Sequence, residues 1–181
     1  MALRPLTDTD NLTLVLSVQN DGSVAAMTRD LNDALTLVRE SLDDPDIYFV
    51  TIDVSGTWRP GDVQLDPWET HFQSAWQSLL DTPGMREPLA AWLGRVTDLL
   101  REKNKEQISC ISEHDEAQFA EVPAALLATA DKRYLPLYTE LMKVWDLDHA
   151  VSQFYVTEQL IELHGKTPET DALAAVAQDW M

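Results

Sequence analysis

Glycine is scarce in this chain, and that scarcity restricts the folds open to it. Only six glycines occur among 181 residues, whereas folds built wholly of β-strands need many glycine-containing tight turns. We therefore expect an α+β protein that is mostly helical, with a small N-terminal sheet and a helical C-terminal remainder. One domain is predicted over residues 1–181, with a small α/β portion at 1–65 and a helical portion at 66–181.

The N-terminal portion carries the strand patterns. Apolar residues alternate over residues 12–18, which is the period of a half-buried strand. Residues 47–54 are rich in β-branched and aromatic side chains, as strands are. Between them, the apolar spacing over residues 24–42 is helical, with Ser23 as a plausible N-cap. Strand, helix and strand in this order predict a small βαβ or split unit, whose pairing the pattern leaves open.

Signals for the start of a helix recur from residue 66 onward. Asp66-Pro67 and Thr82-Pro83 each place a capping side chain before a proline, which predicts helices after them, the second running to residue 105. Shorter helices are expected at 123–130, at 133–145, from Asp148 to Gly165, and from Thr167-Pro168 to Trp180, stacked in pairs. In the helix that Asp148 caps, the apolar residues are Val151, Phe154, Tyr155, Leu160 and Ile161.

The balance of charge is strongly acidic. Thirty-one Asp and Glu face thirteen Lys and Arg, for a net charge of −18. Bare nucleic acid and anionic membranes are disfavoured as partners, because both are bound through Lys and Arg. Two interpretations remain open: a surface that only keeps the protein soluble, or a field that steers a cationic partner into place.

Catalytic motifs are missing from the sequence. It contains no G-x-G-x-x-G, no G-x-x-x-x-G-K-[ST], no H-E-x-x-H and no G-x-S-x-G. The single cysteine, Cys110, lies beside Ile111, which indicates a buried and inert thiol. We therefore expect a protein that is not an enzyme and has no cofactor.

One arrangement keeps an enzymatic alternative open. Asp146, Asp148 and His149 could hold a divalent metal ion, with Glu113 to Asp115 nearby, and the protein would then be a small metal-dependent hydrolase. Acidic turns that cap helices have the same composition, so we predict no metal site. His164 ends a helix, where the helix dipole favours an imidazolium, and a structural role is expected for it.

The acidic clusters are the better candidates for a binding site. Asp43, Asp44 and Asp46 follow the C-terminal end of a predicted helix, where carboxylates oppose the helix dipole, so the sequence holds them there at a cost in stability. Trp58 is a candidate aromatic anchor, since tryptophan is enriched at interface hot spots; a place in the core is the other interpretation. The predicted partner-binding residues are Asp43, Asp44, Asp46, Trp58, Asp62, Glu113, Asp115 and Glu116.

The cytoplasm is the expected location. The N-terminal residues turn acidic at once and contain no long apolar segment of the secretory type. A single cysteine cannot form an internal disulfide. No stretch approaches the roughly 20 apolar residues of a membrane-spanning helix.

Three motifs in the last third of the chain carry a resemblance to a known group. They are Leu-Ala-Thr-Ala-Asp-Lys-Arg-Tyr-Leu-Pro-Leu-Tyr at residues 127–138, Asp-Leu-Asp-His at 146–149, and His164-Gly165. Together they resemble the immunity proteins of bacterial polymorphic toxin systems, including the contact-dependent growth inhibition type.

The resemblance implies a cytoplasmic protein that binds and neutralises one cognate toxin domain. Many such toxins are nucleases with a basic surface, to which an acidic inhibitor is complementary. Pro136 and the tyrosines would then shape a helix and Asp148 would cap the next one, while the acidic loops make the contacts. A DNA-mimicking protein that occupies a nucleic-acid-binding protein without a toxin is a further alternative. The oligomeric state stays open.

Overall fold

Three strands and a series of short helices make up the described part of the chain. The computed structural model describes residues 12–18, 24–28, 31–44, 50–56, 76–77, 79–106, 121–144 and 150–178. Their side chains are described over residues 36–44, 76–77, 79–102, 121–144 and 154–178. The backbone divides into two units, 1–92 and 93–181, with the boundary inside helix α3. The single domain expected over 1–181 stays a prediction.

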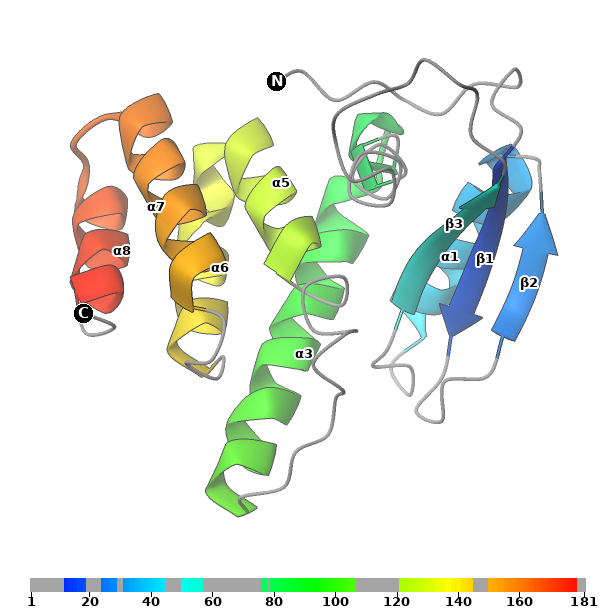
Figure 1. Cartoon of the computed structure of the whole chain (residues 1–181), viewed down its shortest axis with the longest axis horizontal. Helices are drawn as coiled ribbons and strands as arrows, with labels where there is room; N and C mark the ends of the chain where they lie inside the picture. The colour runs from blue at the N-terminus through cyan, green and yellow to red at the C-terminus, as the bar shows by residue number, and fades with distance from the viewer. Residues whose placement is uncertain are drawn as a thin grey trace. The chain divides into compact units, whose positions relative to one another are not determined.

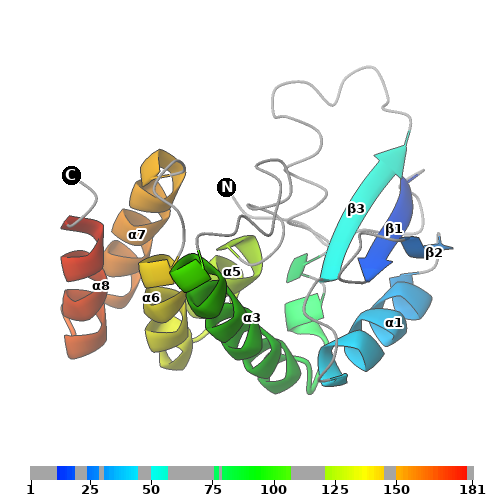
Figure 2. The same cartoon turned by 90° about the horizontal axis from the view of Figure 1, so that it is seen from below.

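In the first unit, three strands form a sheet in the order β2-β1-β3. They are β1 (Leu12–Val18), β2 (Val24–Thr28) and β3 (Val50–Gly56). Both pairings of the central strand β1 are antiparallel. Helix α1 (Leu31–Asp43) contacts all three strands and lies against one face of the sheet (Figures 1 and 2).

The fold class expected from the sequence needs correction. Of the residues whose side chains the structure describes, 89% are helical and none lies in a strand. The packing that can be traced side chain by side chain is therefore helix against helix, and the described core is that of a mostly helical protein. The three strands contribute backbone pairing to the first unit, in a topology that the sequence pattern did not predict.

The specific error concerns the helix of the predicted βαβ or split unit, whose strand pairing the sequence left open. A helix was expected over residues 24–42, but β2 occupies Val24–Thr28 and α1 begins only at Leu31. The apolar residues of this segment fit a helical period, yet pairing with β1 supplies the backbone of Val24–Thr28 with partners that local spacing does not reveal. The result is an antiparallel sheet, since both neighbours of β1 run opposite to it.

A tight turn separates residues 76–81, which are helical where described, from α3 (Arg86–Glu106). The sequence predicted that α3 starts at Thr82-Pro83. Instead, the Thr82 N–H donates to the Leu79 carbonyl (3.1 Å) and closes the preceding helix, and Gly84 adopts a positive φ of 80°. A residue in this left-handed conformation cannot continue a helix. Glycine is favoured at such a position because residues with a Cβ rarely adopt a positive φ.

The helical segment at 76–81 and the start of α3 pack through aromatic rings. Trp76 and Trp92 are fully buried, and their rings stack with centroids 5.9 Å apart and planes 13° apart. Such aromatic pairs contribute about 0.5–1.5 kcal/mol beyond the area they bury.

The second unit is built from two stacked helix pairs. The helices are α5 (Val122–Ala130), α6 (Leu135–Val144), α7 (Ala150–His164) and α8 (Pro168–Gln178), with a single 3₁₀ turn, η2 (Lys132–Tyr134), leading into α6. Helix α5 packs on α6 and α7 packs on α8, while α5 contacts α7 and α6 contacts α8 (Figure 1). This stacking in pairs confirms the arrangement predicted for the C-terminal third.

Hydrogen bonds at the last helix boundary confirm another predicted signal. The Thr170 N–H donates to the Thr167 hydroxyl (3.2 Å), and the Thr167 N–H donates to the Thr170 hydroxyl (2.8 Å). This reciprocal pair satisfies two N–H groups that a helix start leaves without partners. Pro168 occupies the first helical position, where a missing N–H costs nothing. Gly165, with φ 72°, ends α7 as predicted.

The core of the second unit consists of fully buried aliphatic side chains. They come from every helix of the unit, so no single helix buries its apolar face alone. The residues with less than 2% exposure include Leu93, Val96, Leu127, Leu135, Leu141 and Leu173.

Two leucines offer a matched test of this core. Leu141 is fully buried in α6, whereas Leu163 on α7 is 58% exposed. We expect Leu141→Ala to lower the free energy of unfolding by about 2–5 kcal/mol, through lost burial and a cavity. Leu163→Ala should change it by less than about 0.5 kcal/mol. Urea unfolding of both variants measures the difference, and equal losses would contradict the described packing.

Two glycines give a second matched pair. Gly165→Ala should destabilise the protein by about 1 kcal/mol, because a Cβ is strained at its positive φ even though the space around it is open. Gly94 lies inside α3, and beyond its own chain neighbours and helix backbone nothing lies within 4 Å of the position that a Cβ would take there, so Gly94→Ala should stabilise the protein by about 0.5–1 kcal/mol. Thermal unfolding compares the two, and a shift of the same sign for both would refute this account.

Candidate protein-binding surfaces

The first predicted surface lies at the end of α1. Asp43 is the last residue of that helix and Asp44 follows it, and both side chains are exposed. The last turn of α1 contains no basic residue, and Glu40 adds a third exposed carboxylate. Because the C-terminal end of a helix carries partial negative charge, these groups reinforce one another's potential and attract cations.

The other predicted contact residues lie outside the part of the chain that the structure describes. They are Asp46, Trp58, Asp62, Glu113, Asp115 and Glu116. Of the predicted contact residues, the structure therefore places only Asp43 and Asp44, and the grouping of the rest stays a prediction.

The alternative metal site also falls outside the described residues, because Asp146, Asp148 and His149 are not among them. Within the described ranges, no three His, Cys, Asp or Glu side chains come together in a group suited to a metal ion. The metal-dependent hydrolase thus gains no support from the described residues.

The motif at residues 127–138 serves the fold. The Asp131 carboxylate accepts the Arg133 N–H (3.0 Å) and pairs with the Arg133 guanidinium (2.7 Å), which caps η2. The guanidinium also lies 5.6 Å from the centre of the Tyr134 ring. Tyr134 and Tyr138 are buried, whereas Pro136 is exposed in the first turn of α6.

Three buried polar side chains meet where α5, α6 and α7 pack. Glu121, Tyr138 and Thr157 are 5%, 0% and 1% exposed. Burial, and then the negative charge of Glu121, raise the pKa of the Tyr138 hydroxyl above its ordinary value, while the nearby Thr157 hydroxyl acts in the opposite direction. Among the described residues, neither hydroxyl makes a hydrogen bond of ordinary geometry. This group keeps Tyr138 neutral inside an apolar core.

His164 joins two helices of this unit. Its Nε2 lies 2.8 Å from the carbonyl oxygen of Ala128 on α5. A carbonyl only accepts hydrogen bonds, so Nε2 carries the proton and donates. The histidine at the end of α7 therefore holds α7 against α5. Its role is structural, as expected, but the contact is with a neighbouring helix, whereas the sequence suggested an interaction with the dipole of its own helix.

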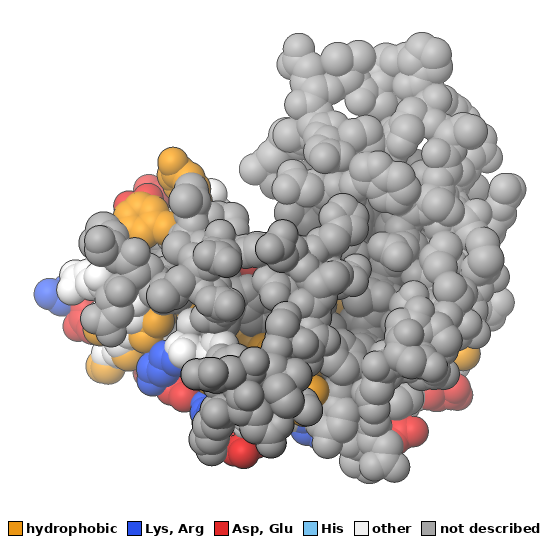
Figure 3. Space-filling model, turned by 60° about the horizontal axis from the view of Figure 1, so that its bottom comes forward, with side chains coloured by type: hydrophobic (Ala, Val, Ile, Leu, Met, Phe, Trp, Pro, Cys, Tyr) orange, Lys and Arg blue, Asp and Glu red, His pale blue; other side chains and the backbone are white. Residues whose placement is uncertain are grey.

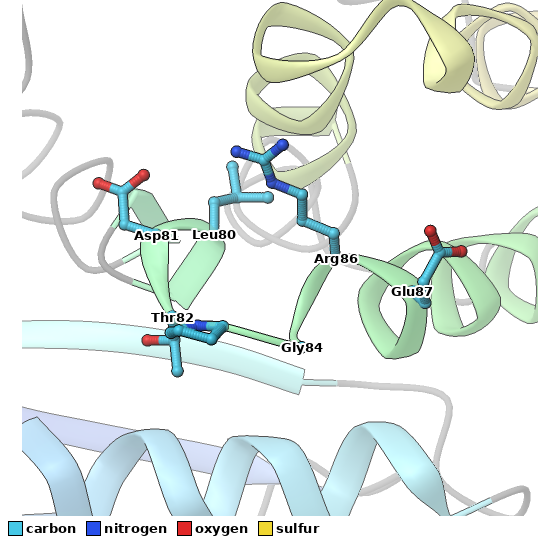
Figure 4. A pocket seen from close by; sticks show the side chains of 7 residues that line it. Leu80, Asp81, Thr82, Gly84, Arg86 and Glu87 are labelled. Carbon is cyan, nitrogen blue, oxygen red and sulfur yellow. The ribbon is translucent and has the colours of Figure 1, made fainter.

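A shallow pocket of about 330 Å³ lies at the turn before α3. All of its lining comes from the short stretch 80–87. Figure 4 shows that the carboxylates of Asp81 and Glu87 and the guanidinium of Arg86 do not converge on a common point. Catalysis needs a nucleophile or base within hydrogen-bonding reach of its partner, so this pocket is the hollow of a turn rather than a candidate active site.

Two large hydrophobic side chains are exposed on α7. Tyr155 is 61% exposed and Leu163 is 58% exposed. The sequence marked Tyr155 as one of the apolar residues of this helix without assigning it to a face. Its position in the helical repeat was the available signal, because it shares the polar side with Glu158 and Glu162, which are both exposed. In Figure 3, hydrophobic side chains lie beside acidic ones at the end of the view that holds the C-terminal helices.

Comparison with protein families, with curated proteins and with solved structures gave no match. Among the helices that the structure describes, none combines the length and the apolar character needed to cross a bilayer.

The buried tyrosine gives a prediction about pH. The raised pKa of Tyr138 means that the unfolded chain loses this proton first, at its ordinary pKa of about 10. Stability is thus fully present below that pH and is lost as the pH rises above it. We expect Tyr138→Phe to reduce this alkaline loss and to change stability at pH 7 by less than about 1 kcal/mol. Urea unfolding at pH 7 and pH 11 tests this; an unchanged alkaline loss would contradict it.

Proposed function

We propose that this protein is an immunity protein that binds and neutralises a cognate basic toxin domain in the cytoplasm. The observation that carries the proposal is the net charge of −18 together with the exposed placement of described carboxylates such as Asp43, Asp44, Glu158 and Glu162. Because these charges are on the surface, they act on whatever approaches the protein.

A nuclease is the toxin class that best complements such a surface. Nucleases hold their substrate with clustered Lys and Arg, which bind phosphates. Carboxylates on the inhibitor can pair with the same Lys and Arg side chains and so compete with the phosphates of the nucleic acid. Binding would then be fast at low ionic strength and would occlude the surface that the substrate needs.

The described residues separate the scaffold from the contact surface. Tyr134 and Tyr138 are buried in the helix pairs, and Asp131 caps η2. These residues serve packing and capping within the fold, so the exposed acidic side chains remain available to contact the toxin. This division agrees with the roles that the resemblance to immunity proteins implies.

Co-expression tests the proposal directly. The test uses the C-terminal domain of the protein encoded immediately upstream of this one. That domain is expressed alone and together with this protein, and cell growth and copurification are measured. We expect toxicity from the domain alone, and restored growth with a stable complex when both are present. Toxicity that persists, with no complex formed, would overturn the proposal.

Reversing the charge at the end of α1 tests the steering role of Asp43 and Asp44. We expect Asp43→Lys with Asp44→Lys to slow association with the toxin domain by about tenfold at low salt, with little change in dissociation. In 1 M salt the Debye length falls to about 3 Å and the difference should vanish. Stopped-flow kinetics measures both rates; an effect on dissociation alone would argue against steering by this cluster.

A further inference from the structure

The outward face of α7 combines apolar and acidic groups. Tyr155 and Leu163 are the only large hydrophobic side chains that are exposed among the described residues. They are eight residues apart on one helix, which separates them by about 12 Å along the axis and about 80° around it. Two such side chains on one face form the kind of anchor pair that interfaces bury.

Along the helix axis, two carboxylates lie between these two anchors, on the Tyr155 side of the helix. Glu158 and Glu162 are exposed on the same side of the helix, with Gln159 between them. Helix α7 contains no Lys or Arg. The face therefore presents two anchors in a negative field.

The fold does not need this face. The opposite side of α7 carries the buried Thr157 and Leu160, and His164 is bonded to the Ala128 carbonyl of α5. Tyr155 makes an edge-to-face contact with Phe154 of the same helix, with ring centroids 6.2 Å apart, and is otherwise open to water. Tyrosine is one of the residues enriched among interface hot spots.

The charge of the face selects its occupant. Anionic membranes and nucleic acids would be repelled by Glu158 and Glu162. A second copy bound face to face would bring the same carboxylates against each other, and like charges opposed across an interface are unfavourable. A cationic protein surface with apolar recesses has neither problem, because its Lys and Arg can pair with the two carboxylates around the buried anchors.

We infer that the outward face of α7 is the docking surface for the cationic toxin domain, with Tyr155 and Leu163 as its apolar anchors. This inference rests on the proposed function and adds the surface to it. The acidic cluster at the end of α1 then affects the approach of the toxin, whereas α7 determines how long the complex lasts.

The test uses the full-length protein and the purified domain encoded just upstream as the probe. Tyr155→Ala with Leu163→Ala should raise Kd by about 30-fold or more, mainly through faster dissociation. Tyr155→Phe with Leu163→Met keeps the apolar volume and should retain most of the affinity. Thermal unfolding of both variants should match the parent protein, because the changed side chains are exposed.

A matched pair of charge variants separates the two acidic surfaces. Glu158→Gln with Glu162→Gln and Asp43→Asn with Asp44→Asn each remove two negative charges. We expect the α7 pair to shorten the lifetime of the complex and the α1 pair to slow its formation. Equal effects on both rates would show that only net charge matters and would overturn the inference.

The remaining outcomes are distinct. If the parent protein binds the domain and the Tyr155→Ala, Leu163→Ala variant binds equally well, the docking surface is wrong and the proposed function stands. If the parent protein does not bind the domain, the proposed function fails and the inference fails with it. If the parent protein is a dimer that this variant converts to a monomer, the face is covered by a second copy and the inference is overturned.

Discussion

The C-terminal part of this protein depends on the mutual burial of short helices. Helices α5, α6, α7 and α8 contain 9, 10, 15 and 11 residues, and isolated helices of this length are marginal in water. Each becomes stable only when a neighbour covers its apolar side. The two stacked pairs satisfy this requirement, and the Thr167–Thr170 cap and the His164–Ala128 hydrogen bond add directional contacts at their ends.

That constraint decides which side chains are left for function. Residues that face a neighbouring helix, such as Leu127, Leu141 and Leu160, are used by the core. Of the acidic side chains that the structure describes, most are exposed, so their charge acts at the surface. Tyr155 and Leu163 break this division, because they are hydrophobic and yet exposed. Their position among carboxylates is the reason for assigning them to a cationic protein partner.

Much of the helical architecture was predictable because helix boundaries are local. Proline after a capping residue identified the start of α8, and Gly165 identified the end of α7, since both depend on backbone groups within a few residues. The same reasoning placed the start of α3 too early, at Thr82-Pro83. The turn between the two helices continues through Gly84, which has a positive φ, and α3 begins only at Arg86. Of the predicted contact residues, Asp43 and Asp44 were placed correctly at an exposed helix end.

The sequence by itself determined the charge, the absence of known catalytic motifs and the local signals for helices, because these depend on residue type and short spacing. Only the structure showed that Val24–Thr28 is a strand paired antiparallel with β1, because the spacing of its apolar residues fits a helix and backbone pairing leaves no mark in that spacing. It also decided that Tyr155 faces water although Leu160 does not. An apolar residue is buried only where another helix arrives to cover it, and that depends on packing between elements distant in the sequence.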